Sequence, residues 1–191
     1  ETIEQRFDKH VVIPDTHGEY KKVARVVDAY YEDEAIGFVF LGDIVDRKGV
    51  ENDPEQGVRR TLDIIKNLGT RAIVTQANHE WMLLGSALAV DPEVRRAIAT
   101  SWLLPYKSRT SVEINTAASY DLTNTGVDTA ARLWREMRLH GHAAVLTSAT
   151  PYYETDTFIA VHAGMTHQPW EQQKQHLEDV STDMAAGIFW Q

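Results

Sequence analysis

The stretch that decides the fold of this chain is residues 38–48, with the sequence FVFLGDIVDRK. It begins with apolar residues typical of a buried strand and runs directly into Asp43, Asp46 and Arg47. Charge is costly inside a sheet, so carboxylates at a strand's carboxyl end indicate the crevice where α/β proteins bind ligands. One carboxylate could bridge two divalent ions, the other could orient a histidine, and the guanidinium could hold a phosphate. For this stretch alone, a surface loop with an ordinary ion pair is the alternative.

Two other predicted strands also end in polar clusters. Residues 10–15 (HVVIPD) predict a strand whose end brings Asp15 and His17 together, and residues 71–75 (RAIVT) predict one that is followed by Asn78 and His79. Helical spacing of apolar residues lies between the first two strands, so we expect them to be parallel and their ends to share one sheet edge. The alternatives are a simple turn at the first cluster and an ordinary helix start, capped by Asn78, at the second.

The remainder of the chain predicts more helix and one further strand. Asp53 and Pro54 have the form of a helix start, and residues 158–161 (FIAV) predict a strand that ends at His162. Residues 105–126 are rich in small polar residues and read as an irregular insertion. His140 and His142 fit an exposed helix end better than an extra metal site.

Composition narrows the class of protein. The 191 residues, 43% hydrophobic and 25% charged, are expected to form one domain over residues 1–191, with an irregular or helical insertion at about 105–150. The formal net charge of −9 argues against a nucleic-acid-binding protein. The sequence has no cysteine, which excludes disulfides and thiolate sites and favours a cytoplasmic location. No apolar run reaches the ~20 residues of a membrane span.

Four motifs in this order resemble those of the calcineurin-like metallophosphoesterases. They are Asp15-x-His17-Gly18, Gly42-Asp43-x-x-Asp46-Arg47, Asn78-His79-Glu80 and Val161-His162-Ala163-Gly164. The likeness is greatest to the phosphoprotein-phosphatase branch, which includes bacterial and phage Ser/Thr phosphatases and symmetrical diadenosine tetraphosphatases.

The resemblance implies an α/β (α+β) fold, a four-layer α/β/β/α sandwich of mixed sheets with outer helices. It also implies two divalent metal ions, Mn²⁺ by family analogy, with Fe or Zn²⁺ as alternatives. On this analogy the first ion is held by Asp15 and His17, and the second by Asn78 and His162. Asp43 bridges the two ions.

The resemblance assigns the catalytic chemistry as well. His79 is the general acid, oriented by Asp46, while Arg47, together with Asn78, contacts the phosphate. Paired ions bind phosphoryl oxygens and generate hydroxide for in-line attack, so no protein nucleophile is required.

The sequence departs from the family pattern at three places. Ala77 stands where the family has Gly, which would strain the backbone if that position needs a positive φ. Lys48 stands where Gly usually follows the Asp-Arg pair. The family's later Gly-His motif has no counterpart, so we expect the chain to be an excerpt that lacks the C-terminal strands.

The leading expectation is therefore a metal-dependent phosphatase that acts on phosphate monoesters, with a phosphorylated protein or a nucleotide as substrate. A dinucleoside tetraphosphate hydrolase is one alternative. A non-catalytic binding module that retains the fold is another.

Overall fold

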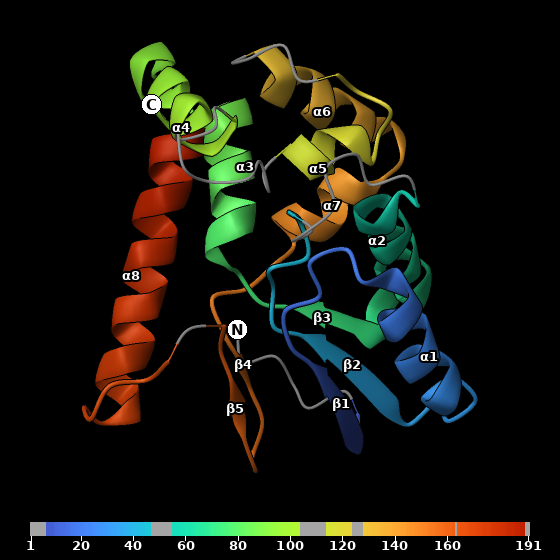
Figure 1. Cartoon of the computed structure of the whole chain (residues 1–191). Helices are drawn as coiled ribbons and strands as arrows, with labels where there is room; N and C mark the ends of the chain where they lie inside the picture. The colour runs from blue at the N-terminus through green and yellow to red at the C-terminus, as the bar shows by residue number, and fades with distance from the viewer. Residues whose placement is uncertain (1–6, 47–54, 104–113, 124–127, 163, 190–191) are drawn as a thin grey trace.

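The structure, a computed structural model, describes residues 7–46, 55–103, 114–123, 128–162 and 164–189. Fourteen elements follow one another along these residues (Figure 1). They are β1 Lys9–Ile13, α1 Tyr20–Tyr30, β2 Ile36–Phe40, α2 Gly57–Leu68, a 3₁₀ turn η1 Gly69–Arg71, β3 Ala72–Val74, α3 Asn78–Leu88, α4 Pro92–Leu103, α5 Ile114–Ala118, α6 Asp128–Leu139, α7 His142–Thr147, β4 Tyr153–Glu154, β5 Ile159–Ala160 and α8 Trp170–Phe189.

The first three strands form a parallel sheet in the order β1-β2-β3. β2 lies in the middle, with Val39 opposite Val12 of β1 and Ile73 of β3. All five residues of β2 are buried, because both faces of the sheet are covered, and this explains the continuous apolar sequence of that strand. The predicted parallel arrangement is confirmed, and the carboxyl ends of the three strands meet at one edge.

Alternate residues of β2 face two different cores. Phe38 and Phe40 belong to the larger core, which the helices α1 and α2 help to form, whereas Val39 packs with Tyr153 and Ala160 of the β4–β5 hairpin. The hairpin is antiparallel and lies between the parallel sheet and helix α8 (Figure 1). The layers therefore run helix, sheet, hairpin, helix, and the expected α/β architecture is confirmed. Among the described residues, the strands form one parallel sheet and one antiparallel pair.

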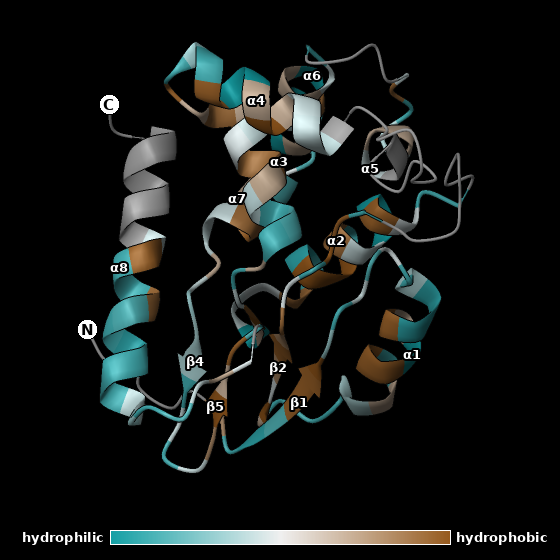
Figure 2. Ribbon diagram, turned by 60° about the vertical axis from the view of Figure 1, so that its left-hand side comes forward, coloured by the Kyte–Doolittle hydropathy of each residue, from teal (hydrophilic) through white to brown (hydrophobic). Residues whose placement is uncertain are grey.

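A second group of helices stands above the carboxyl edge of the sheet. Helix α3 leaves β3, packs against α4 and α6, and also contacts α8. Colouring by hydropathy shows brown, apolar residues along the ribbons of α2 and α3 (Figure 2). Helices α5, α6 and α7 occupy the described parts of the stretch expected to be an insertion.

Two sequence-based expectations for the helices are wrong. Helix α2 begins at Gly57 rather than after Asp53, because Gln56 before it has a left-handed backbone with φ of 52°. His142 is fully buried rather than exposed, because its ring fits between Tyr120 and Asp63 and donates or accepts a hydrogen bond at each nitrogen. Arg47, Lys48, Asp53 and Pro54 lie outside the described residues. In the part of the chain that is described, no helix has both the length and the apolar character needed to cross a membrane.

Candidate metal centre

The loops that follow β1 and β2 are joined into one structure at the sheet edge. The amides of Thr16 and His17 donate to the carbonyl oxygen of Asp43, at 3.1 and 2.8 Å. His17 and Asp43 both have left-handed backbones, with φ of 40° and 47°. These tight conformations turn both side chains out of the strand direction and toward each other.

The buried carboxylate of Glu80 holds the second of these loops in place. It accepts hydrogen bonds from the amides of Asp43, Ile44 and Val45, at 2.9, 2.7 and 3.1 Å. Burial raises the pKa of Glu80 to about 7, although the amide donors act in the opposite direction. The first turn of α3 therefore fixes the backbone that presents Asp43.

One group of potential ligand atoms comes from His17, Asp43 and His79. Its atoms all lie within 4.8 Å of one another. His17 Nδ1 donates to the carbonyl oxygen of Val45 at 3.0 Å, so its Nε2 faces Asp43 Oδ2 at 3.5 Å. His79 Nε2 lies 3.9 Å from the same oxygen.

A second group comes from Asp15, Asp43 and His162, with its atoms also within 4.8 Å. His162 Nδ1 donates to the carbonyl oxygen of Leu41 at 2.7 Å. Its Nε2 then faces Asp43 Oδ1 at 3.6 Å and Asn78 Oδ1 at 3.2 Å. Asp15 was expected beside His17, but its carboxylate lies 3.7 Å from His162 Nδ1 and is half exposed.

The donor set fits divalent cations. His17 Nε2 is buried and has no hydrogen-bond partner among the described residues. In neutral His162, the proton on Nδ1 leaves a lone pair on Nε2 that faces the oxygens of Asp43 and Asn78. Lone pairs pointing at one another are unfavourable unless a cation lies between them. Imidazole and carboxylate or amide oxygens are ligands for Mn²⁺, Fe and Zn²⁺.

His79 and Asp46 form a pair beside this centre. His79 Nδ1 donates to Asp46 Oδ2 at 2.8 Å, and the Asp46 side chain is completely buried. The hydrogen bond to Asp46 raises the pKa of His79, against the opposing effect of burial. The ring therefore turns Nε2 toward Asp43, and it binds a second proton more readily than an ordinary histidine.

Sequence reasoning missed two residues that touch Asp46. Trp102, at the end of α4, donates from Nε1 to Asp46 Oδ2 at 2.7 Å, and Thr116 of α5 donates to Asp46 Oδ1 at 2.6 Å. Neither belongs to a recognisable motif. Thr116 lies in the stretch that was expected to be irregular, and nothing in the sequence around it indicated a contact with Asp46.

Ala77 shows no backbone strain. Its φ of −140° and ψ of 163° are extended, so this position does not require glycine. The special geometry belongs to Gly42, which has φ of +83° and lies directly against the Ala77 methyl group. Gly42 is therefore the residue that lets the loops approach closely.

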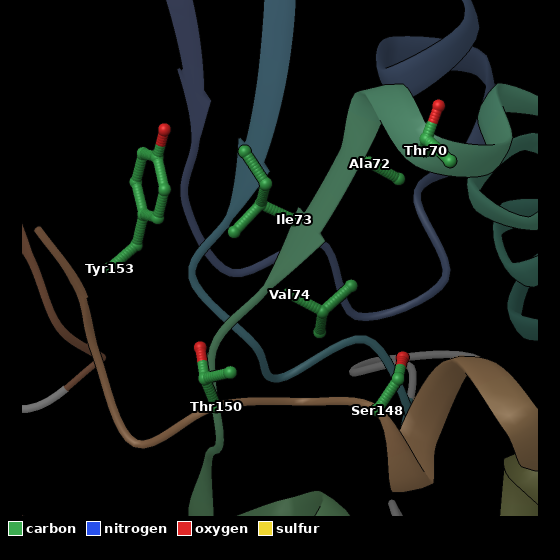
Figure 3. A pocket seen from close by; sticks show the side chains of 7 residues that line it. All are labelled: Thr70, Ala72, Ile73, Val74, Ser148, Thr150 and Tyr153. Carbon is green, nitrogen blue, oxygen red and sulfur yellow. The ribbon is translucent and has the colours of Figure 1, made fainter. Parts of the chain in front are cut away.

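The pocket beside β3 is separate from this centre. It has a volume of about 210 Å³, and Figure 3 shows Ile73 of β3 pointing toward Tyr153, whereas the adjacent Val74 points to the other side of the strand. None of the predicted site residues lines it. It is not the place where the polar clusters meet.

Comparison with known proteins gives one match. The family model described as calcineurin-like phosphoesterase matches residues 9–185. No curated protein and no solved structure matches the chain. The matched residues include all four sequence motifs, from Asp15 to Gly164.

Proposed function

The chain belongs to the calcineurin-like phosphoesterase family, and from the arrangement around Asp43 we propose that it hydrolyses phosphate monoesters with two divalent metal ions. The observation that carries this proposal is that Asp43 belongs to both groups of potential ligands. Its two carboxylate oxygens face different histidines, Oδ2 toward His17 and Oδ1 toward His162. A carboxylate shared in this way suits the bridge of a two-metal site.

The residues that would hold the ions are Asp15, His17, Asp43, Asn78 and His162. His79 also belongs to the first group of potential ligands, but we assign it the separate role of general acid. Bound ions would supply Lewis-acid chemistry, withdrawing electron density from the phosphoryl group and making water a better nucleophile near neutral pH. No serine, threonine or cysteine is then needed as a nucleophile. By analogy with the family, Mn²⁺ is the metal we propose at both positions.

His79 is suited to protonate the leaving alcohol. Asp46 accepts the Nδ1 proton, which keeps the ring orientation fixed and favours the imidazolium form. The second proton is then on Nε2, which faces the centre 3.9 Å from Asp43 Oδ2. A general acid in this position typically contributes about 10²- to 10⁴-fold in rate.

The substrate we favour is a phosphorylated serine or threonine of a protein. A dinucleoside tetraphosphate is the alternative, because the same chemistry serves both and the surrounding groove decides between them. Arg47 is the proposed second contact to the phosphate, together with Asn78. The lack of cysteine favours action in the cytoplasm.

The first experiment measures hydrolysis of 4-nitrophenyl phosphate by metal-stripped protein, with and without added Mn²⁺. Turnover that appears only with the metal supports the proposal, and His79→Asn should then lower kcat for phosphoserine by about 10²- to 10⁴-fold. Phosphopeptides and diadenosine tetraphosphate, compared under the same conditions, separate the two substrate classes.

A non-catalytic binding module is the rival hypothesis. It was motivated in part by Ala77, whose extended backbone now removes that argument. It predicts weak or single-metal occupancy and no turnover. If Asp43→Asn left both metal binding and hydrolysis unchanged, the two-metal proposal would be wrong.

A further inference from the structure

Asp46 lies behind His79, and α4 and α5 each bring one side chain to it. We infer that Thr116 and Trp102 are positioning residues that fix the Asp46 carboxylate so that it orients the His79 ring. The catalytic part of this inference rests on the proposed function. The geometric part does not rest on the proposed function, because it concerns only the hydrogen bonds among the side chains of Asp46, Thr116 and Trp102.

The carboxylate of Asp46 has donors on both oxygens. Trp102 Nε1 and His79 Nδ1 both donate to Oδ2, at 2.7 and 2.8 Å, while Thr116 Oγ1 donates to Oδ1 at 2.6 Å. Asp46, Trp102 and Thr116 are all completely buried. A buried carboxylate needs hydrogen-bond donors at its oxygens, and short hydrogen bonds of this kind define its orientation tightly.

The Thr116 hydroxyl also controls the backbone of Asp46. It accepts a hydrogen bond from the Asp46 amide at 2.9 Å while it donates to the Asp46 side chain. This matters because Asp46 has a left-handed backbone, with φ of 63°, which is not the preferred conformation of a residue with a side chain. One hydroxyl therefore sets both the backbone turn and the direction of the carboxylate.

The two positioning residues come from separate helices, and this makes the arrangement rigid. Trp102 ends α4, which packs along α3, the helix that carries His79. Thr116 belongs to α5, which contacts α2 and α6. With its oxygens held from two sides, Asp46 offers Oδ2 to His79 in one geometry, and the His79 ring has one orientation toward Asp43.

Nuclear magnetic resonance on protein labelled with ¹⁵N-histidine tests the geometry without using activity. The Nδ1 proton of His79, assigned by its loss in His79→Asn, should exchange slowly with water because it is bonded to buried Asp46. Thr116→Val and Trp102→Phe each remove one donor to the carboxylate and retain most of the side-chain volume. Each should speed this exchange by about 10-fold, the factor that corresponds to the loss of one hydrogen bond to a charged group.

Matched controls separate positioning from general packing. Thr116→Ser retains the hydroxyl and should preserve slow exchange. Thr61→Val removes a buried hydroxyl that donates to Gly57 in α2, and Trp134→Phe removes an indole N–H from α6. Neither control touches Asp46, so both should leave the His79 proton unchanged.

Kinetics then test the catalytic consequence. Loss of general-acid positioning slows substrates with poor leaving groups most, so Thr116→Val and Trp102→Phe should lower kcat for phosphoserine by about 10- to 100-fold. The loss for 4-nitrophenyl phosphate should be several-fold smaller. Adding Thr116→Val to His79→Asn should cost little more, because residues that act as a unit are not additive.

The outcomes distinguish the two hypotheses. Unchanged exchange of the His79 proton in both variants overturns the inference, whatever the activity. If exchange quickens in both variants but wild-type protein has no metal-dependent turnover, the positioning role stands and the proposed function fails. If kcat falls equally for phosphoserine and 4-nitrophenyl phosphate, and the effect of Thr116→Val adds in full to that of His79→Asn, the catalytic part of the inference is wrong. If one variant does not fold, the other still tests the inference, because each variant removes a different hydrogen-bond donor to the Asp46 carboxylate.

Discussion

At the scale of single residues, Glu80 connects helix α3 to the loop that presents Asp43. We expect Glu80→Gln to lower the free energy of unfolding by about 2 kcal/mol, because the amide group turns a donor toward backbone N–H groups that need an acceptor. Urea denaturation measures this change. Exposed Glu93→Gln is the matched control and should change stability by less than about 0.5 kcal/mol. A loss for Glu80→Gln no larger than that of the control would contradict this interpretation.

Gly42 and Ala77 are coupled by contact. A Cβ atom on Gly42 would meet the Thr75 carbonyl oxygen at 2.9 Å and would also contact the Ala77 methyl group. With φ of +83° as well, Gly42→Ala should cost at least about 2 kcal/mol of stability. The cost should be smaller in an Ala77→Gly background, because one of the two clashes is removed. A double-mutant cycle by urea denaturation measures the coupling, and an equal cost in both backgrounds would show that the two positions are independent.

At the scale of elements, the sequence predicts strand ends better than it predicts contacts from distant helices. Asp15, Asp43 and Asn78 were expected to converge because parallel strands bring their carboxyl ends to one edge, and the structure brings them there. Trp102 and Thr116 reach Asp46 across 56 and 70 residues of sequence. No periodicity reports such a contact, because it depends on how whole helices pack.

Glu154 of the β4–β5 hairpin makes two of the contacts that hold helix α8. Glu154 accepts hydrogen bonds from Trp170 Nε1 at 2.7 Å and Lys174 Nζ at 2.8 Å. Trp170 also packs edge-on against Tyr152, with ring centroids 5.2 Å apart. Because these contacts join the hairpin to the first turns of α8, we expect Glu154→Ala to loosen this end of the helix.

Hydrogen exchange detected by mass spectrometry measures that effect. Amides at the start of α8 should exchange faster in Glu154→Ala, while those of the parallel sheet should not change. Glu171→Ala, an exposed substitution in the first turn of the same helix, is the control. If amide exchange quickens equally in the sheet and in α8, the Glu154 contacts stabilise the whole fold rather than only the start of α8.

At the scale of the whole molecule, buried His142 makes stability depend on pH. Burial lowers the pKa of His142 below its ordinary value of 6.5, although Asp63 acts in the opposite direction. Tyr120, Lys66 and His140 also face this ring. The unfolded chain therefore binds the proton more readily, so this contribution to stability is complete above about pH 6.5 and is lost as the pH falls through the lower folded-state pKa.

Urea denaturation between about pH 7.5 and 5 tests this dependence. The free energy of unfolding should decrease toward acid pH, and the decrease should be smaller in His142→Gln, which does not titrate. His167→Gln, a substitution of an exposed histidine, should leave the slope unchanged. A slope that is the same in His142→Gln and wild type would assign the acid sensitivity to other groups, such as His10, whose pKa burial also lowers.

Metal binding should stabilise the entire fold, because the candidate ligands come from the loops after β1, β2 and β5 and from the first turn of α3 after β3, and they converge only in the folded chain. A ligand present at a hundred times its Kd stabilises the folded state by about 2.7 kcal/mol. For a chain of this size that corresponds to a rise in Tm of roughly 5 to 10 °C. Addition of Mn²⁺ to metal-stripped protein, followed by differential scanning calorimetry, measures the rise.

The size of the Tm increase in variants tests whether Asp43 is shared. Asp43→Asn should abolish most of it, since Asp43 belongs to both groups of ligands, whereas Asp15→Asn should remove only the part due to the group with His162. Asp156→Asn changes the charge equally at an exposed position of the hairpin and should retain the full increase. If Asp43→Asn lost no more of the Tm increase than Asp15→Asn, the two groups of ligands would bind metal independently. The two ions would then not share a carboxylate.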